Sequence, residues 1–239
     1  MKILNLSIVV ALCMVSLCCA QEKTQPQAQG KVQQQTKEKV PPPVQEKVLP
    51  PAQEKAQEKG LLIDDFEGAI SGGPEGTVDF GTGENSKVEV TAATDIKHTG
   101  NQSLKVTYNA LPGGYMWVAR GFNLDAKNTA WLVKPEEIDW KKYNAISFWM
   151  YGSNSGTNIA FDVKDNGKEI YRFMLTDDFT GWKQIECPFS DFYPRGDWQP
   201  DGADKNGALD FPIKSYQFEP KAEAKGVVYF DTVELVNKK

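Results

Sequence analysis

The distribution of aromatic residues divides this chain near residue 60. All 6 Trp, 8 Tyr and 12 Phe lie after that position. Aromatic side chains supply much of the apolar area that a core buries, so only the later part of the chain can build a sizeable core. That part is about the length of one ordinary domain. We therefore expect a single folded domain over residues 60–239.

The net charge of this domain limits the classes of ligand that it can be expected to bind. Without the eight Lys and five Glu of residues 1–59, the domain retains 19 basic and 27 acidic residues, a formal charge of −8. An acidic surface repels the phosphates of nucleic acids. Nucleic acid is therefore excluded as an expected partner, whereas uncharged ligands remain open.

Residues 1–20 have the pattern of a signal peptide. Lys2 precedes a mostly apolar run, and residues 18–20 supply small side chains for a cut after Ala20. An uncleaved membrane anchor and a lipoprotein signal with a lipidated cysteine stay open, and either would tether the protein to a membrane. The domain keeps only Cys187, so no internal disulfide can form. Export without disulfides favours a bacterial protein that is secreted or held in the cell envelope.

Residues 21–59 read as a disordered linker. The tripeptide Gln-Glu-Lys occurs four times, and Pro41-Pro42-Pro43 and Pro50-Pro51 lie between the repeats. Such a segment cannot bury enough apolar surface to offset the entropy lost on ordering. We expect a proline-stiffened spacer between the signal peptide and the domain.

From Leu61 onward the sequence has the patterns of strands. Leu104, Val106 and Tyr108 alternate with polar residues, which is typical of a half-buried strand. Asp165-Asn166-Gly167 separates two such runs, a strong hairpin signal. Further strands are expected at Lys87–Ala92, Tyr115–Phe122, Ile146–Tyr151, Asn158–Lys164, Lys168–Leu175, Lys183–Phe189, Ile213–Phe218 and Val227–Val236, and a helical turn in Pro135–Tyr143. Pro188 places its strand at a sheet edge or ends it. The predicted fold is all-β, an antiparallel β-sandwich of the jelly-roll type.

Several segments resemble a known family. Leu62–Gly68, Thr99–Tyr108 and Tyr229–Val233 resemble segments of calcium-containing jelly-roll carbohydrate-binding modules and of the complex I assembly-factor family. The central block is more specific. The succession Trp182–Phe192, Arg195–Pro200 and Gly207–Asp210 is similar to the family-11 carbohydrate-binding module of bacterial glucanases.

The resemblance implies a galactose-binding-domain-like jelly roll with structural calcium, and we expect the protein to be a monomer. It further implies a concave cleft for single chains of β-1,4 or mixed β-1,3-1,4 glucan. The residues that it places at this cleft are Tyr115, Asp165, Arg195, Asp197, Trp198 and Ser215. The segment Asp125–Lys142 has no clear counterpart in the family.

The chemistry of these residues suits a sugar. A pyranose presents hydroxyl groups and an apolar C–H face, and Arg195-Gly196-Asp197-Trp198 offers a donor, an acceptor and a flat ring. A surface loop with its Trp packed inward remains the alternative. Trp149 and Tyr151 have strand parity opposite to Phe148. They either line the cleft or belong to the second face of a buried strand.

Asp231 is the main candidate for a metal site. It has the strand parity of Tyr229 and Val233, so we expect it in or beside the core, where a carboxylate needs a cation or hydrogen-bond donors. Carboxylate and carbonyl oxygens suit Ca²⁺. The predicted calcium ligands are Glu67, Asp231, Thr99 and Asn101. A protein donor such as Lys105 or a backbone amide is the alternative.

Catalysis has little support in the sequence. His98 is the only histidine and lies in a polar stretch, and no nucleophile motif is present. A glycosidase needs two suitably spaced carboxylates, and the acids here are spread through turns. We expect a non-catalytic protein that assists glucan breakdown by targeting or capture. A protein-interaction module of the assembly-factor type is the alternative, and a β-glucanase a more distant one.

Overall fold

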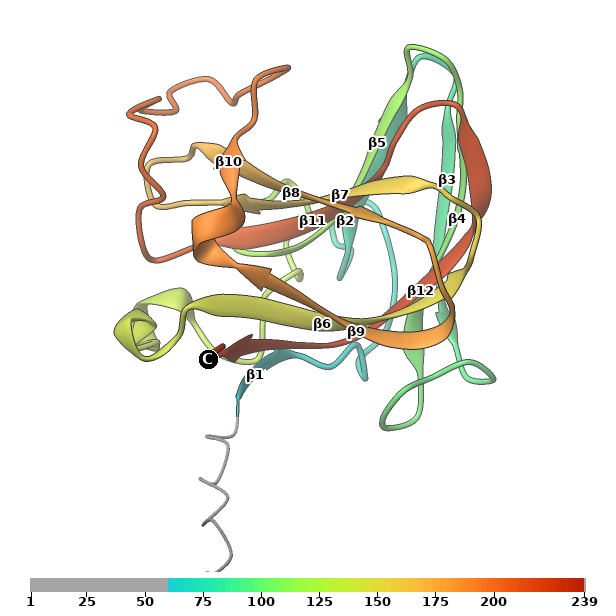
Figure 1. The fold of residues 1–239 in the computed structure, drawn as a ribbon, viewed down its shortest axis with the longest axis horizontal. Coiled ribbons are helices and arrows are strands. Elements are labelled where there is room, and N and C mark those ends of the chain that lie inside the picture. The colour runs from blue at the N-terminus through green and yellow to red at the C-terminus, as the bar shows by residue number, and fades with distance from the viewer. Residues whose placement is uncertain (1–59, 239) are drawn as a thin grey trace, which may run out of the picture. The chain divides into compact units, whose positions relative to one another are not determined.

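The computed structural model describes residues 60–238, which form two antiparallel sheets (Figure 1). The predicted all-β sandwich is confirmed. The signal-peptide and linker predictions concern residues that lie outside this described part. Between residues 60 and 238 no helix has the length and apolar character needed to cross a membrane.

The first sheet, sheet A, has β12 near its centre. Its strand order is β3 (Lys87–Ala93), β4 (Ser103–Ala110), β12 (Ala224–Val236), β6 (Ala145–Ser153) and β9 (Thr180–Pro188), and β1 (Leu61–Asp64) also pairs with β12. The order in sheet B is β10 (Tyr193–Pro194), β8 (Ile170–Thr176), β7 (Asn158–Lys164), β11 (Ser215–Pro220), β5 (Tyr115–Gly121) and β2 (Asp79–Gly83). Three 3₁₀ turns connect strands: η1 (Pro135–Glu137), η2 (Trp140–Lys142) and η3 (Phe189–Asp191).

The turn signals of the sequence are confirmed. In the hairpin between β7 and β8 the N–H of Lys168 donates to the carbonyl of Asp165. The strand that ends at Pro188 is the edge strand β9, where a missing N–H costs no ladder bond. Strand β2 escaped prediction because its sequence, Asp-Phe-Gly-Thr-Gly, has one apolar side chain, and β10 because it has two residues.

Aromatic side chains from both sheets form the centre of the core. Phe148 and Phe230 come from sheet A, Phe161 and Phe218 from sheet B, and all four are fully buried. The rings of Phe218 and Phe230 stack with centroids 3.6 Å apart, and those of Phe148 and Phe161 lie 4.7 Å apart. This contact holds the two sheets together without a disulfide.

A buried ion pair also joins the sheets. Arg120 on β5 donates from Nε and Nη2 to the fully buried carboxylate of Asp64 on β1, at 2.8 Å each. The hydroxyl of Tyr216 on β11 donates to the same carboxylate at 2.7 Å. Because both carboxylate oxygens accept hydrogen bonds, the charge of Asp64 can remain in the core.

Asp231 is buried as predicted, but it does not share the side of Val233. A β-bulge interrupts the pairing of β12 with β6 between Asp231 and Glu234, and Thr232 has a φ of 48°. The bulge ends strict alternation, so Tyr229 and Asp231 share the outer side of sheet A while Val233 points into the core. Asp231 is nevertheless fully buried, because its carboxylate accepts the backbone N–H groups of His98 and Thr99 in a covering loop.

Cys187 offers a test of the packing. Its side chain is fully buried on β9, and burial raises the pKa of its thiol well above the ordinary value. In a fragment of residues 60–239, which contains no other cysteine, we expect negligible reaction with an aromatic disulfide reagent until denaturant is added. Rapid labelling of the native fragment by one equivalent would contradict this packing.

Candidate functional site

A row of polar and aromatic side chains crosses the outer face of sheet B. The register pairs Gln217 on β11 with Asp162 on β7, Asp162 with Arg172 on β8, and Arg172 with Tyr193 on β10. Side chains alternate along a strand, so the residues of this row face away from the aromatic core. The row therefore runs across four neighbouring strands on one surface.

Two buried carboxylates form the base of this surface. Asp162 and Glu219 are 1% and 2% exposed. Arg172 donates to Asp162 at 2.8 Å and to Glu219 at 2.7 Å. Arg195 lies 3.3 Å from Asp162 and 3.1 Å from Glu219. Buried carboxylates require such partners, because an unpaired charge away from water costs several kcal/mol.

The cluster is completed by Asp197 and Lys221. Arg195 donates in bidentate fashion to the exposed carboxylate of Asp197, at 2.7 and 3.0 Å. This bond lowers the pKa of Asp197 to about 2. Lys221 lies 2.6 Å from Glu219. The three cations and three anions of the ion cluster (Arg172, Arg195, Lys221, Asp162, Asp197 and Glu219) give it a formal charge of zero.

Exposed aromatic rings border the ion cluster. Trp198 is 55% exposed, and its ring lies 5.7 Å from the guanidinium carbon of Arg195. Tyr193 is 47% exposed at the end of the polar row. Tyr115, on β5 of the same sheet, is 50% exposed. Large exposed aromatic side chains beside satisfied polar groups are typical of a ligand surface.

The predicted Arg195, Asp197 and Trp198 are thus brought together over sheet B, and Ser215 belongs to β11 of the same sheet. Ser215 is on the outer side of β11, paired with Gly121 and Lys164, and is 3% exposed.

Asp165 has a different environment from the rest of the predicted set. It lies in the turn after β7, where its buried carboxylate accepts the N–H groups of Glu169 and Asp210. Burial raises its pKa. Its carboxylate ties the turn to the loop before β11, whereas Asp162, three residues earlier, is one of the three acids in the ion cluster.

Trp149 and Tyr151 lie on sheet A, so they do not line the face that carries Arg195. They instead belong to the second face of the strand β6, which was the alternative interpretation of their parity. Trp149 stacks on the ring of His98 with centroids 3.6 Å apart. Tyr151 contacts Trp182 and Tyr229 edge-on, with interplanar angles of 77° and 86°. These rings pack against one another across three strands.

Sequence reasoning missed four of the six members of the ion cluster, Lys221 among them. Asp162, Arg172 and Glu219 were not singled out, although each is a charged residue inside a strand whose other side is apolar. Their opposing charges on adjacent strands become visible only when the register is known. Gln217, which donates to Asp162 at 3.1 Å, was missed for the same reason.

The four predicted calcium ligands meet around one loop. Glu67 accepts the N–H groups of Asn101 and Gln102, at 2.8 and 3.2 Å, and the side-chain amide of Asn101 at 2.9 Å. Burial acts to raise the pKa of Glu67, but these hydrogen bonds outweigh it and lower the pKa. Thr99 Oγ1 lies 2.8 Å from the hydroxyl of Thr232, which donates to Asp231.

These carboxylates are therefore satisfied by protein donors, as the backbone-amide alternative predicted. No group of three or more His, Cys, Asp and Glu side chains suited to a metal ion occurs among residues 60–238. The donor set is nevertheless oxygen-rich, and each carboxylate has about four lone-pair sites. A calcium ion would need the threonine hydroxyls to turn and the Asn101 side chain to move.

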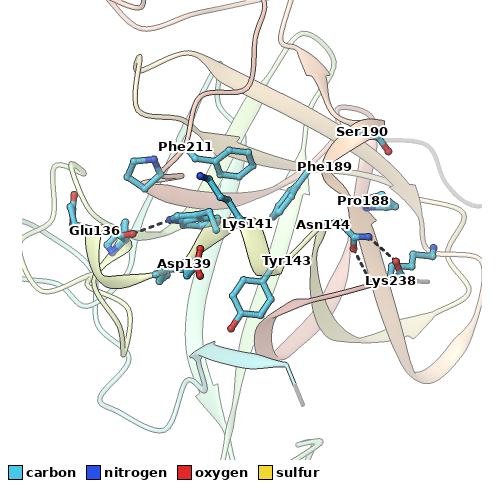
Figure 2. Close-up of a pocket in the computed structure, with 14 residues that line it drawn as sticks. Glu136, Asp139, Lys141, Tyr143, Asn144, Pro188, Phe189, Ser190, Phe211 and Lys238 are labelled. Carbon is cyan, nitrogen blue, oxygen red and sulfur yellow. Dashed lines mark hydrogen bonds between the residues drawn. The ribbon is translucent and has the colours of Figure 1, made fainter. Parts of the chain in front are cut away.

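A hollow of about 990 Å³ lies between η1, η2 and the end of β9 (Figure 2). Its lining includes residues between Pro135 and Lys141, part of the segment that has no family counterpart. Trp140 donates to the carbonyl of Pro135 at 2.9 Å, and its ring lies 5.2 Å from that of Phe211 and 6.3 Å from that of Phe189. Volume alone favours this hollow as a binding site. Its aromatic rings, however, pack mainly against one another, and the ion cluster lies on sheet B.

Residues 47–238 match the carbohydrate-binding domain of family 11. This chain belongs to that family. Endoglucanase H of Acetivibrio thermocellus is 31% identical over 183 residues, which cover 73% of this chain and 18% of the relative. The chain thus spans less than a fifth of that curated relative. The family 11 module therefore accounts for the whole described part of this chain, but for a small part of endoglucanase H.

Two solved structures of family 11 modules from Clostridium thermocellum have the same fold. One, in complex with a β-1,3-1,4-mixed-linked tetrasaccharide, is 27% identical with a TM-score of 0.59 and covers 74% of this chain and 95% of its own. The other, from the cellulosomal cellulase Lic26A-Cel5E, is 25% identical with a TM-score of 0.57 and covers 75% and 95%. The family assignment made from the central block of the sequence is confirmed.

The buried part of the ion cluster should dominate its contribution to stability. Replacing Arg172 by Met leaves two buried carboxylates with one close guanidinium, and we expect a loss of roughly 3–5 kcal/mol in the free energy of unfolding. Asp197→Asn removes an exposed partner and should cost roughly 1 kcal/mol or less. Urea unfolding of the two variants measures both values, and equal losses would contradict the account.

Proposed function

We propose that this protein binds β-glucan, as β-1,4 or mixed β-1,3-1,4 chains, on the outer face of sheet B and does not cleave it. The observation that carries the proposal is the ion cluster of zero formal charge bordered by Trp198, Tyr193 and Tyr115. In the whole protein this binding would target or capture glucan for separate enzymes.

The chemistry of this face fits an uncharged polysaccharide. A flat aromatic ring covers the C–H face of a pyranose, and charged groups exchange hydrogen bonds with its hydroxyls. The exposed carboxylate of Asp197 keeps lone pairs that a sugar hydroxyl can use. A balanced cluster offers no net attraction to an anionic polymer, which favours neutral glucan over acidic polysaccharides. The tetrasaccharide in the related family 11 complex supports a mixed-linked chain as the ligand.

The environment of the acids supports binding without hydrolysis. Asp162 and Glu219 are almost fully buried beneath Arg172 and Arg195, so neither can reach a glycosidic oxygen or hold an attacking water. Hydrolysis requires two carboxylates that flank the scissile bond. The acids of this face are instead used to hold the arginines in position.

Three further properties belong to the proposal. We propose export by the N-terminal signal, to the medium or the envelope of a bacterium, with lipidation as one route of attachment. The protein would act as a monomer, because a single polysaccharide chain needs only one such face. A structural calcium would bind at the loop 97–102 through Glu67, Asp231, Thr99 and Asn101, whose oxygens are of the type that Ca²⁺ prefers.

Affinity gels test the proposed ligand. The purified full chain should be retarded by barley β-glucan and by hydroxyethylcellulose, and should migrate freely in xylan and mannan gels. We expect Trp198→Ala to lower the affinity for β-glucan at least tenfold, because a loss of roughly 1.4 kcal/mol accompanies removal of a good aromatic contact.

Phe211→Ala is the matched control, because Phe211 is 41% exposed and lines the hollow of Figure 2. It should be retarded like the unmodified protein. Free migration of the unmodified protein in every gel would refute glucan binding. Release of reducing sugar in the same samples would refute the non-catalytic assignment.

Removal of calcium tests the proposed metal. We expect a chelator to lower the melting temperature by several degrees, since a ligand bound only to the folded state stabilises it. The double substitution Glu67→Gln and Asp231→Asn should abolish the response to added calcium. An identical melting temperature with calcium and with chelator would remove the ion from the account, leaving the backbone amides as the partners of both carboxylates.

A further inference from the structure

Two aromatic residues of β5 lie over glycines of the neighbouring strand. The register pairs Gly81 with Trp117 and Gly83 with Tyr115. A Cβ built at Gly81 would lie 2.6 Å from the far edge of the Trp117 ring. At Gly83 the added atom would collide with the outer end of the Tyr115 ring, 2.2 Å from Cζ. Any side chain at either glycine would displace these rings. The two glycines of β2 therefore provide the space in which the rings lie.

The two rings form an ordered pair. Their centroids are 6.3 Å apart and their planes differ by 16°. The indole N–H of Trp117 donates to Asp79 Oδ1 at 3.1 Å, which fixes the orientation of the ring. Asp79 also accepts the N–H of Asp125, so its carboxylate is itself held in place. A preorganised aromatic pair loses little side-chain entropy when a ligand covers it.

The pair adjoins the ion cluster. Phe218 on β11 pairs with Val118, so Glu219 and Trp117 are the next residues along on the outer face. Glu219 is the carboxylate that Arg195 and Lys221 contact. Trp198 follows β10, the strand at the opposite edge of the sheet, and its ring lies 5.7 Å from the guanidinium carbon of Arg195. A ligand that crossed all six strands would span about 24 Å, given a spacing of ~4.8 Å between strands.

We infer that Trp117, beside the Tyr115 already assigned to the binding face, is a further stacking subsite that binds a pyranose ring at the β5–β2 edge. The chain of a β-glucan would cross sheet B from Trp198, over the ion cluster, to Trp117. The inference rests on the proposed glucan binding and adds a length requirement to it. Short oligosaccharides held near Trp198 do not reach Trp117, whereas longer ones do.

Isothermal titration of the full chain with a mixed-linked trisaccharide and hexasaccharide tests this inference. Trp117→Ala should weaken hexasaccharide binding about tenfold, the equivalent of roughly 1.4 kcal/mol. It should change trisaccharide affinity less than about threefold. Trp117→Phe, which keeps a ring but not the bond to Asp79, should recover most of the affinity. Trp182→Ala is the matched control, because Trp182 lies on sheet A among other aromatic rings.

A spectroscopic measurement keeps the test independent of the Ala variant's folding. The protein has six tryptophans, and the indole N–H signal that disappears in Trp117→Phe identifies Trp117. That signal should shift when hexasaccharide is added to the unmodified protein.

A stationary signal, or a folded Trp117→Ala variant with unchanged hexasaccharide affinity, would overturn the subsite while leaving glucan binding intact. Failure of the unmodified protein to bind any of the glucans would instead overturn the proposed function, and the subsite with it.

Discussion

The burial of two like charges on adjacent strands constrains the whole binding face. Asp162 and Glu219 lie on β7 and β11 with almost no exposure, and each needs cations close by. Arg172 supplies one from β8, and Arg195 supplies another from the loop after β10. This requirement draws an otherwise peripheral loop onto the sheet. Asp197 and Trp198 follow Arg195 in sequence, so the same interaction brings a hydrogen-bonding group and a stacking ring to the surface.

The inner and outer faces of sheet B have different compositions. Between the sheets, Phe148, Phe161, Phe218 and Phe230 form a dry aromatic core, and the bond from Arg120 to Asp64 joins β5 to β1. On the outer face of sheet B, aromatic rings lie at the edges with balanced charges between them. This open face suits a polysaccharide, since a long chain can extend past both edges, whereas an enclosed hollow admits only a chain end.

The fold was largely predictable because its signals are local. Alternation of apolar and polar residues, the Asp165-Asn166-Gly167 turn and Pro188 each report on a few neighbouring residues, and all were read correctly. The missed features depend on residues far apart in sequence. The bulge at Thr232 puts Asp231 and Val233 on opposite sides of sheet A, and a bulge leaves no periodic pattern in the sequence. Trp149 lies on sheet A, whereas Arg195 contacts the residues of sheet B. The parity of residues within one strand does not show to which sheet the strand belongs.

The most direct test of the central claim is a crystal structure of the full domain with a mixed-linked hexasaccharide. The account predicts sugar density across the outer face of sheet B, with one pyranose on Trp198 and hydroxyls within hydrogen-bond distance of Arg195 and Asp197. Sugar bound in the hollow beside Phe211, or on the outer face of sheet A beside Trp149, would contradict it.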